Sequence, residues 1–291
     1  LEKIDIKSMT LQEIQREFQA AGLPGYRAGQ VYRWLHRGVK SFSQMSDLGK
    51  GLREQLAGQY QIKSAEIAGK RVSKDGTVKY LFRMNDGETV ESVLMQYKHG
   101  YSICISTQVG CRMGCTFCAT GKSGFRETSR RARCSRRSRP PRRTSGRASP
   151  TWFDGHGRAT RQLSECFKVF GACFVRNGLN IGMRHISLST CGLVDKIYDL
   201  ADRKLQLTLS VSLHAPNDEI RSRTMPVNKK WNVEALLKEL PLIIPTRPAG
   251  GSPFEICDDQ RTLNDSDACA QELAARLRGI ISHVNLIPVN D

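Results

Sequence analysis

The chain has 291 residues, enough for one large domain and a smaller one. No apolar run reaches membrane-spanning length and the first residues form no signal-peptide core, so we expect a soluble, cytoplasmic protein without a membrane partner. Ten cysteines in such a chain favour metal or thiol chemistry over a disulfide framework.

The formal net charge of +17 is unevenly distributed along the chain. Residues 126–161 contain twelve arginines, no lysine and two acidic residues, so this segment alone carries +10. The remainder has only a modest basic excess, which suits an RNA partner. The arginine-rich segment needs a separate explanation.

The N-terminal part of the chain shows the periodicity of amphipathic helices. Thr10 and Glu13 form a capping-box pattern at the start of the first helix. Three helices are predicted, over residues 10–20, 28–37 and 48–56. Together they predict a small helical domain over residues 1–60.

From Gln61 onward the apolar period changes to two, which is typical of strands. Three strands are predicted, Ile62–Val72, Tyr80–Met84 and Val90–Met95, with turns at Asp75-Gly76 and Asp86-Gly87. We expect them to form a β bridge over residues 61–96 that leads into the main domain, residues 97–291.

Three cysteines then follow at a spacing that points to an iron–sulfur cluster. Cys111, Cys115 and Cys118 form a C-x3-C-x2-C run, which matches neither zinc-finger nor thioredoxin spacing. A cubane cluster normally takes four cysteines, so three would leave one iron open to a substrate or cofactor. The alternative is a structural zinc knuckle or a chance grouping, although no fourth ligand follows at zinc-finger spacing.

The residues around these cysteines resemble one enzyme family. Residues 104–121, Cys-Ile-Ser-Thr-Gln-Val-Gly-Cys-Arg-Met-Gly-Cys-Thr-Phe-Cys-Ala-Thr-Gly, are similar to the RlmN/Cfr family of radical S-adenosylmethionine (SAM) methyltransferases. These enzymes modify adenine C2 or C8 of 23S ribosomal RNA. The resemblance implies that the three cysteines hold a 4Fe-4S cluster whose open iron is chelated by SAM.

A second string supports the same resemblance. Residues 25–34, Gly-Tyr-Arg-Ala-Gly-Gln-Val-Tyr-Arg-Trp, followed by residues 42–50, look like the N-terminal accessory domain of these methyltransferases, which helps to hold RNA. Arg27, Arg33 and Arg37 would then contact phosphates. A solvated helix face explains the same charges equally well.

The resemblance also implies two catalytic residues. Glu91 lies in Val-Glu-Ser-Val-Leu, residues 90–94, and matches a glutamate that accepts a proton. Cys104 matches the thiol that resolves a covalent protein–RNA adduct. Without the resemblance, Glu91 would be an ordinary solvent-facing strand residue and Cys104 a small buried hydrophobe.

Polar residues follow two strands that are predicted farther along, His185–Thr190 and Leu205–Leu213. In barrel-like α/β enzymes, polar residues at the carboxyl ends of strands line the active site. The resemblance assigns contacts with SAM to Ser189, Ser212, Leu213, His214 and Asn290. For the serines and the histidine, satisfied turn residues are the alternative. Two helices and a last strand are predicted over Val233–Leu240, Ala268–Arg278 and Val284–Asn290.

One patch does not fit an α/β core. Residues 126–150 are almost wholly Arg, Ser, Pro, Thr, Gly and Ala, a composition that cannot bury a core. Back-translating residues 154–162 and shifting by one base gives Met-Gly-Met-Gly-Glu-Pro-Leu-Asp, and the family requires a Gly-Glu-Pro motif here. We therefore expect residues 126–175 to be translated out of frame.

A second patch shows the same feature. A one-base shift of residues 256–262 completes a strand of the family that begins at Phe254-Glu255. On this interpretation Cys134, Cys166 and Cys173, all in the first patch, have no role. The family also continues beyond Asp291 into a tail with a second essential cysteine, so we expect that the C-terminal end is missing.

The predicted fold class is α/β, a partial (β/α)6 radical SAM barrel preceded by a small helical accessory domain. The resemblance implies methyl transfer to C2 of an adenine in 23S ribosomal RNA, with tRNA as a further substrate. The methyl group would pass through a methyl-cysteine in the tail, activated by a 5′-deoxyadenosyl radical from SAM. The implied partners are RNA and an electron donor such as flavodoxin, and the enzyme would be a monomer.

Two alternatives stay open. Methylation at adenine C8 belongs to the same family, and the sequence does not distinguish it from C2. We expect the chain as written to be inactive. The second alternative is therefore a non-catalytic pseudogene product whose arginine run binds nucleic acid without sequence preference. The nucleotide sequence around the two patches distinguishes this second alternative from an enzyme.

Overall fold

The computed structural model describes residues 3–98, 100–122, 125–128, 148–153, 181–240, 252–258 and 263–288. The chain divides into two compact units. Among the described residues, the first unit contains those up to Ile105, Ala148–Pro150 and Ile181–Gly182, and the second contains Ser106–Thr128, Thr151–Phe153 and those from Met183 onward. The three-part division expected from the sequence stays a prediction.

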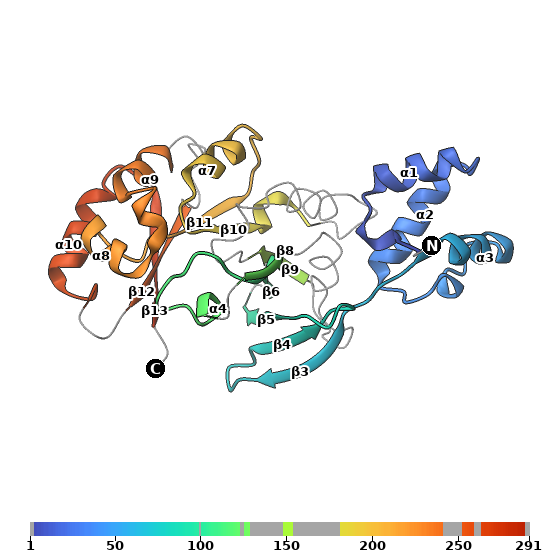
Figure 1. Cartoon of the computed structure of the whole chain (residues 1–291), viewed down its shortest axis with the longest axis horizontal. Coiled ribbons are helices and arrows are strands. Elements are labelled where there is room, and N and C mark those ends of the chain that lie inside the picture. The colour runs from blue at the N-terminus through green and yellow to red at the C-terminus, as the bar shows by residue number, and fades with distance from the viewer. Residues whose placement is uncertain are drawn as a thin grey trace. The chain divides into compact units, whose positions relative to one another are not determined.

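The first unit begins with helices. They are η1 Ile6–Ser8, α1 Leu11–Ala20, α2 Gly25–Arg37, η2 Phe42–Gln44 and α3 Lys50–Gln59 (Figure 1). The predicted capping box starts α1: the Thr10 hydroxyl accepts from the Glu13 amide at 3.1 Å, and the Glu13 carboxylate accepts from the Thr10 amide at 2.5 Å. A short parallel pair, β1 Ile4–Asp5 with β2 Tyr60–Gln61, joins the two ends of this helical part.

These helices share one core because each turns its apolar stripe inward. Ile14 and Phe18 of α1 and Val31 and Leu35 of α2 are at most 2% exposed. Burial of each such side chain contributes about 1.5–3 kcal/mol. The three predicted helices are confirmed, although α2 begins three residues earlier than predicted and α3 ends three residues later.

An antiparallel sheet follows in the same unit. Its strands are β3 Glu66–Val72, β4 Val78–Arg83, β5 Thr89–Tyr97 and β6 Gly100–Ile105, paired in chain order. The predicted turns are confirmed: the side chains of Asp75 and Asp86 accept hydrogen bonds from the amides two residues on, at 3.0 and 3.1 Å. Register places Val93 opposite Cys104.

The second unit contains parallel strands joined by helices. Its strands are β10 Ser187–Thr190, β11 Thr208–Ser212, β12 Ser252–Asp258, β13 Ser282–Pro288 and the last three residues of β9 Ala148–Phe153. They pair in the order β9, β10, β11, β12, β13. The helices between and after them are η4 Met183–His185, α7 Val194–Ala201, α8 Asp218–Thr224, η5 Pro226–Lys229, α9 Val233–Glu239 and α10 Asp267–Arg276. In Figure 1, α8, α9 and α10 lie together on one side of β10–β13. This alternation confirms the predicted α/β class.

The remaining elements of this unit surround the cysteine loop. Strand β7 Gln108–Gly110 pairs antiparallel with β8 Phe125–Thr128, and the short helix α4 Ala119–Lys122 lies between them in the chain. Every residue of β10 is buried, as expected for a parallel strand covered on both faces. Within the described ranges, no helix is long and apolar enough to span a membrane.

Parts of the two patches expected to be out of frame belong to strands. Strands β8 and β9 lie largely or wholly in the first patch, and β12 includes residues 256–258 of the second. The pairing of β12 with β13 extends through Asp258, opposite Pro288. The other residues of the patches lie outside the described residues, including Cys134, Cys166 and Cys173.

Candidate iron–sulfur site

The three cysteines lie on a loop that is held by backbone hydrogen bonds. The amide of Cys118 donates to the carbonyl of Cys115 at 3.2 Å, and that of Gly121 donates to the carbonyl of Cys118 at 3.0 Å. The amide of Thr116 donates to the carbonyl of Thr224, at the end of α8, at 3.0 Å. The loop is therefore fixed both internally and to α8.

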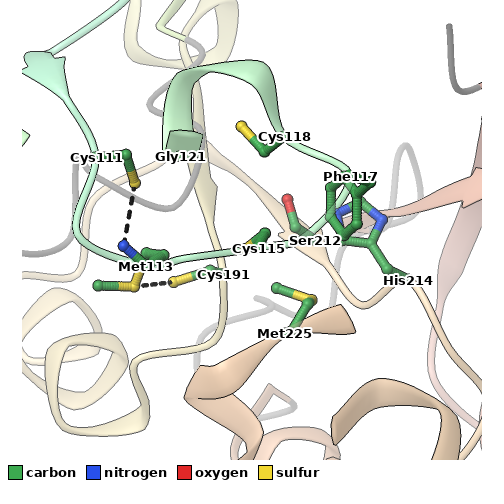
Figure 2. Close-up of a pocket in the computed structure, with 10 residues that line it drawn as sticks. All are labelled: Cys111, Met113, Cys115, Phe117, Cys118, Gly121, Cys191, Ser212, His214 and Met225. Atoms are coloured by element: carbon green, nitrogen blue, oxygen red, sulfur yellow. Dashed lines mark hydrogen bonds between the residues drawn. The ribbon is translucent and has the colours of Figure 1, made fainter. Parts of the chain in front are cut away.

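Cys111, Cys115 and Cys118 line one pocket in the second unit (Figure 2). Its empty volume is ≈ 410 Å³, counting space open to solvent. The other lining residues come from the loop, from the ends of β10 and β11 and from the turn after α8; they are Met113, Phe117, Gly121, Cys191, Ser212, His214 and Met225. The pocket thus brings the predicted cluster ligands together with two of the predicted SAM contacts, Ser212 and His214.

Contacts to sulfur link the loop with the end of β10. The amide of Met113 donates to the Sγ of Cys111 at 3.5 Å, and the Sγ of Cys191 donates to the Sδ of Met113 at 3.3 Å (Figure 2). An N–H donor stabilises the thiolate form that a metal requires. Cys191 follows β10 directly and is only 3% exposed.

Burial holds thiols of this pocket in the protonated form. It is the main cause that raises the pKa of Cys115 to about 11, with further contributions from Cys118 and Cys111. Burial likewise raises the pKa of Cys191 to about 12. Because a metal binds thiolates, cluster assembly must release protons here and is favoured as the pH rises.

Two unusual backbone conformations occur at the strand ends. Gly192, after β10, has a φ of 93°, and a Cβ there would lie 2.9 Å from Leu236 Cδ2 and 3.1 Å from Arg221 Nη2. Only glycine fits this position. His214, after β11, has a φ of 59°, and its ring meets that of Phe117 edge to face at a centroid distance of 4.7 Å (Figure 2). The left-handed turn, which histidine tolerates better than most residues, directs the imidazole toward the pocket.

A buried arginine connects the segments around the pocket. Arg221 of α8 is 0% exposed. Its Nε donates to the carbonyl of Leu213 at 3.1 Å, and its Nη2 donates to the carbonyl of Cys191 at 2.8 Å. Its Nη1 donates to the side-chain oxygen of Asn228 at 2.8 Å and to the carbonyl of Trp231 at 3.0 Å. Burial lowers the pKa of Arg221, yet an arginine keeps its proton in proteins.

The residues present fit a thiolate-bound cluster. Among the described residues, no three His, Cys, Asp or Glu side chains stand close enough to hold a single metal ion. A cubane makes a different demand, because each thiolate binds its own iron and the sulfurs therefore stand apart. Three cysteines around one pocket, with an N–H donor at Cys111, meet that demand.

The other predicted SAM contacts are placed differently. Ser189 is buried within β10, and Leu213 is fully buried and offers its carbonyl to Arg221. Neither residue lines the pocket. Asn290 lies outside the described residues.

The predicted catalytic pair, Glu91 and Cys104, belongs to the first unit. Cys104 on β6 is half-buried and lies opposite Val93, two residues after Glu91 on β5. Directly paired residues share a face, as do residues two apart, so the two side chains project from the same face of the sheet. Glu91 forms an ion pair with Lys79 at 2.8 Å, beside a hollow that Lys70 and Arg71 also line.

Comparisons with known proteins agree with this geometry. Residues 4–62 match the family model described as the ribosomal RNA large subunit methyltransferase N-terminal domain. The chain is 42% identical to a probable dual-specificity RNA methyltransferase RlmN from Alkaliphilus oremlandii, with 100% of this chain and 85% of that protein covered. The chain belongs to the RlmN family. A relative of the same name from Bacillus velezensis is 39% identical over 99% of this chain and 80% of its own length.

A solved structure extends the RlmN assignment to the fold. The crystal structure of a radical SAM methyltransferase from Sphaerobacter thermophilus is 34% identical, covers 99% of this chain and 86% of its own, and superposes with a TM-score of 0.89. The predicted radical SAM fold is therefore confirmed. Membership of the RlmN family, whose relatives are named RNA methyltransferases, implies SAM and a 4Fe-4S cluster as cofactors.

Several residues at the site of this RlmN-family chain were not predicted from the sequence. Cys191 carried a usable signal, since it stands in a Ser-Thr-Cys-Gly string directly after a predicted strand. Met113 and Met225 carried none, because a methionine at a loop position is ordinarily a core residue. Arg221 lies in a helix among other charged residues and gave no sign of being buried.

Proposed function

We propose that this chain derives from an enzyme that transfers a methyl group to C2 of an adenine in 23S ribosomal RNA, with tRNA as a further substrate. The observation that carries the proposal is the gathering of Cys111, Cys115 and Cys118 with Ser212 and His214 around one pocket. The names of the relatives support RNA as the substrate. An electron donor such as flavodoxin, action in the cytoplasm and a monomeric state belong to the same proposal.

The residues of the pocket would divide the work of holding the cofactors. Cys111, Cys115 and Cys118 would hold the cluster as thiolates, which when bound supplies the electron for reductive cleavage of SAM. Adenine C2 is not nucleophilic, so methylation there needs radical chemistry that side chains alone cannot supply. The hydroxyl of Ser212 and the imidazole of His214 would bind polar groups of SAM. Ser189, Leu213 and Asn290 remain predicted contacts.

Glu91 and Cys104 would act on the RNA. Glu91 would accept the proton that adenine loses, and Cys104 would resolve the covalent protein–RNA adduct of a methyl-cysteine route. Their shared face on β5 and β6 supports a joint role, because diagonal neighbours in such a pair lie about 7–8 Å apart. The Glu91 carboxylate also forms an ion pair with Lys79 at 2.8 Å.

The test uses the full in-frame product of the same gene, supplied with SAM, a reductant and either 23S ribosomal RNA or tRNA. We expect 2-methyladenosine in mass spectra of RNA digests, separated by chromatography from an 8-methyladenosine standard. The Cys104→Ala variant should accumulate a covalent RNA adduct, and the Cys118→Ala variant should form neither this adduct nor 2-methyladenosine. Formation of 8-methyladenosine would establish the alternative position, and the absence of both products would overturn the function.

The arginine-rich segment favours a second candidate for the chain as written, a non-catalytic protein that binds nucleic acid. Arg158 stands where the shifted reading places the glutamate of the Gly-Glu-Pro motif. We therefore expect the written chain to bind RNA weakly, with a strong dependence on salt, and to form no methyladenosine in the same assay. Methyladenosine from the written chain would refute this expectation.

A further inference from the structure

Arg221 carries a buried charge that no acidic side chain among the described residues contacts directly. Its four acceptors are three backbone carbonyls and the amide oxygen of Asn228, and it forms no ion pair within the part of the chain that the structure describes. The carboxylate of Asp218 acts on Arg221 electrostatically. The two side chains are bridged by Asn228, which accepts from Arg221 Nη1 and whose Nδ2 donates to Asp218 Oδ1 at 2.9 Å. An amide therefore separates the two charges.

Burying a cation beside neutral partners alone is unfavourable. The pocket next to Arg221 would, however, gather negative charge from three thiolates. Arg221 reaches this pocket through the carbonyl of Cys191, a residue that lines it, at 2.8 Å from Nη2.

The same side chain holds the walls of the pocket in place. Arg221 joins the end of β10, through the carbonyl of Cys191, to the end of β11, through the carbonyl of Leu213. Its helix, α8, also receives the hydrogen bond from Thr116 of the cysteine loop at the carbonyl of Thr224. Because these hydrogen bonds hold Arg221 in place, a substitution that changes its charge would change the electrostatic field at the cysteine loop.

We propose that Arg221 is a positioning residue that serves as the buried counter-charge of the 4Fe-4S cluster and raises its reduction potential. This inference rests on the proposed function. One electron from an external reductant, dithionite in the test, takes the cluster core from 2+ to 1+, so the core with its three thiolates goes from −1 to −2. A fixed cation stabilises the more negative state to a greater extent.

The test compares substitutions that change the charge in opposite directions. In Arg221→Met the cation is lost, and we expect the reduction potential to fall. In Arg221→Lys the cation is kept with fewer hydrogen bonds, and the potential should stay near that of the unsubstituted chain. In Asp218→Asn an acid is lost, yet the oxygen that accepts from Asn228 and from the Val233 amide is kept, and the potential should rise.

A matched control lies on the same helix. Arg223 is exposed and pairs with Glu219 at 2.5 Å, so solvent screens its charge. Arg223→Met should leave the potential unchanged. The potentials would be read from the electron paramagnetic resonance signal of the reduced cluster during a dithionite titration of the reconstituted written chain, at equal iron content per chain.

The outcomes separate this inference from the function on which it rests. A fall in Arg221→Met with a rise in Asp218→Asn supports the inference, because a purely structural role would not give opposite signs. Equal falls in Arg221→Met and Arg221→Lys, or no shift in Asp218→Asn, would overturn it while leaving the cluster assignment intact. If Arg221→Met assembles no cluster, the sign in Asp218→Asn decides. An unsubstituted chain that assembles no cluster would overturn this inference, while the assay of the in-frame product still decides the proposed function.

Discussion

Cys111, Cys115 and Cys118 differ from the chain's other described cysteines in their surroundings. They share one pocket and one loop, whereas Cys269 lies on α10, where it is half-buried. Cys191 reaches the same pocket from β10 and contacts Met113, so it contributes to the wall rather than to the C-x3-C-x2-C run. The surroundings therefore distinguish the three candidate ligands from Cys269, and their position on the loop distinguishes them from Cys191.

This difference predicts the effect of removing each thiol. Cys111→Ala, Cys115→Ala and Cys118→Ala should each abolish the brown colour and the bound iron of anaerobically reconstituted protein, because a cluster held by two thiolates lacks a stable terminal ligand set. Cys269→Ala should keep both. Comparable losses in Cys269→Ala would contradict the ligand assignment.

The ends of β10 and β11 shape the site at the scale of elements. Both strands run parallel with Ser189 opposite Ser210, so their carboxyl ends emerge on the same edge. Gly192 allows the chain to turn close to α9, and His214 turns back toward the pocket through a left-handed conformation. The strand ends therefore place side chains that lie far apart in the sequence around one space.

The turn at Gly192 gives a prediction about stability. Gly192→Ala would strain a positive φ, which costs about 1–2 kcal/mol, and would also press a Cβ against Leu236 and Arg221. Gly279 has a similar φ of 85° with nothing within 4 Å of a Cβ, so Gly279→Ala isolates the strain. We expect urea unfolding to show a larger decrease in the free energy of unfolding for Gly192→Ala than for Gly279→Ala. Equal decreases would show that the close contact at Gly192 is relieved without cost.

The whole chain contains two compact units and two patches whose composition departs from the family pattern. The relatives align over nearly all of the chain, so the patches interrupt one continuous protein. Strands β8, β9 and β12 occupy parts of the patches. Strand pairing uses backbone groups, so a shifted reading that retains residues able to extend can still pair there.

The frame interpretation makes a prediction for the whole gene. Its nucleotide sequence should contain a one-base shift near codon 126 that is restored near codon 175, and a second between codons 256 and 262. The shifted reading should encode a Gly-Glu-Pro motif in place of Arg158 and its neighbours. Resequencing of the gene and its transcript checks this, and an uninterrupted frame with arginine codons at these positions would disprove it.

Local patterns in the sequence determined most of the elements. The capping box at Thr10 fixed the start of α1, and alternation with Asp-Gly turns predicted β4 and β5 to within two residues at each end. The start of α2 was predicted three residues late because the helix begins at Gly25, before its buried apolar stripe, which starts at Ala28. Boundaries of this kind depend on backbone contacts that periodicity does not record.

The sequence by itself also determined the RlmN family and predicted the ligand loop, because the spacing of three cysteines within eight residues is local information. Only the tertiary structure decided what surrounds them. Cys191 meets Met113 across 78 positions of sequence, and Arg221 reaches the carbonyl of Cys191 across 30. Such contacts arise when parallel strands bring their carboxyl ends together, and the burial of the Arg221 guanidinium is visible only once the fold has removed it from water.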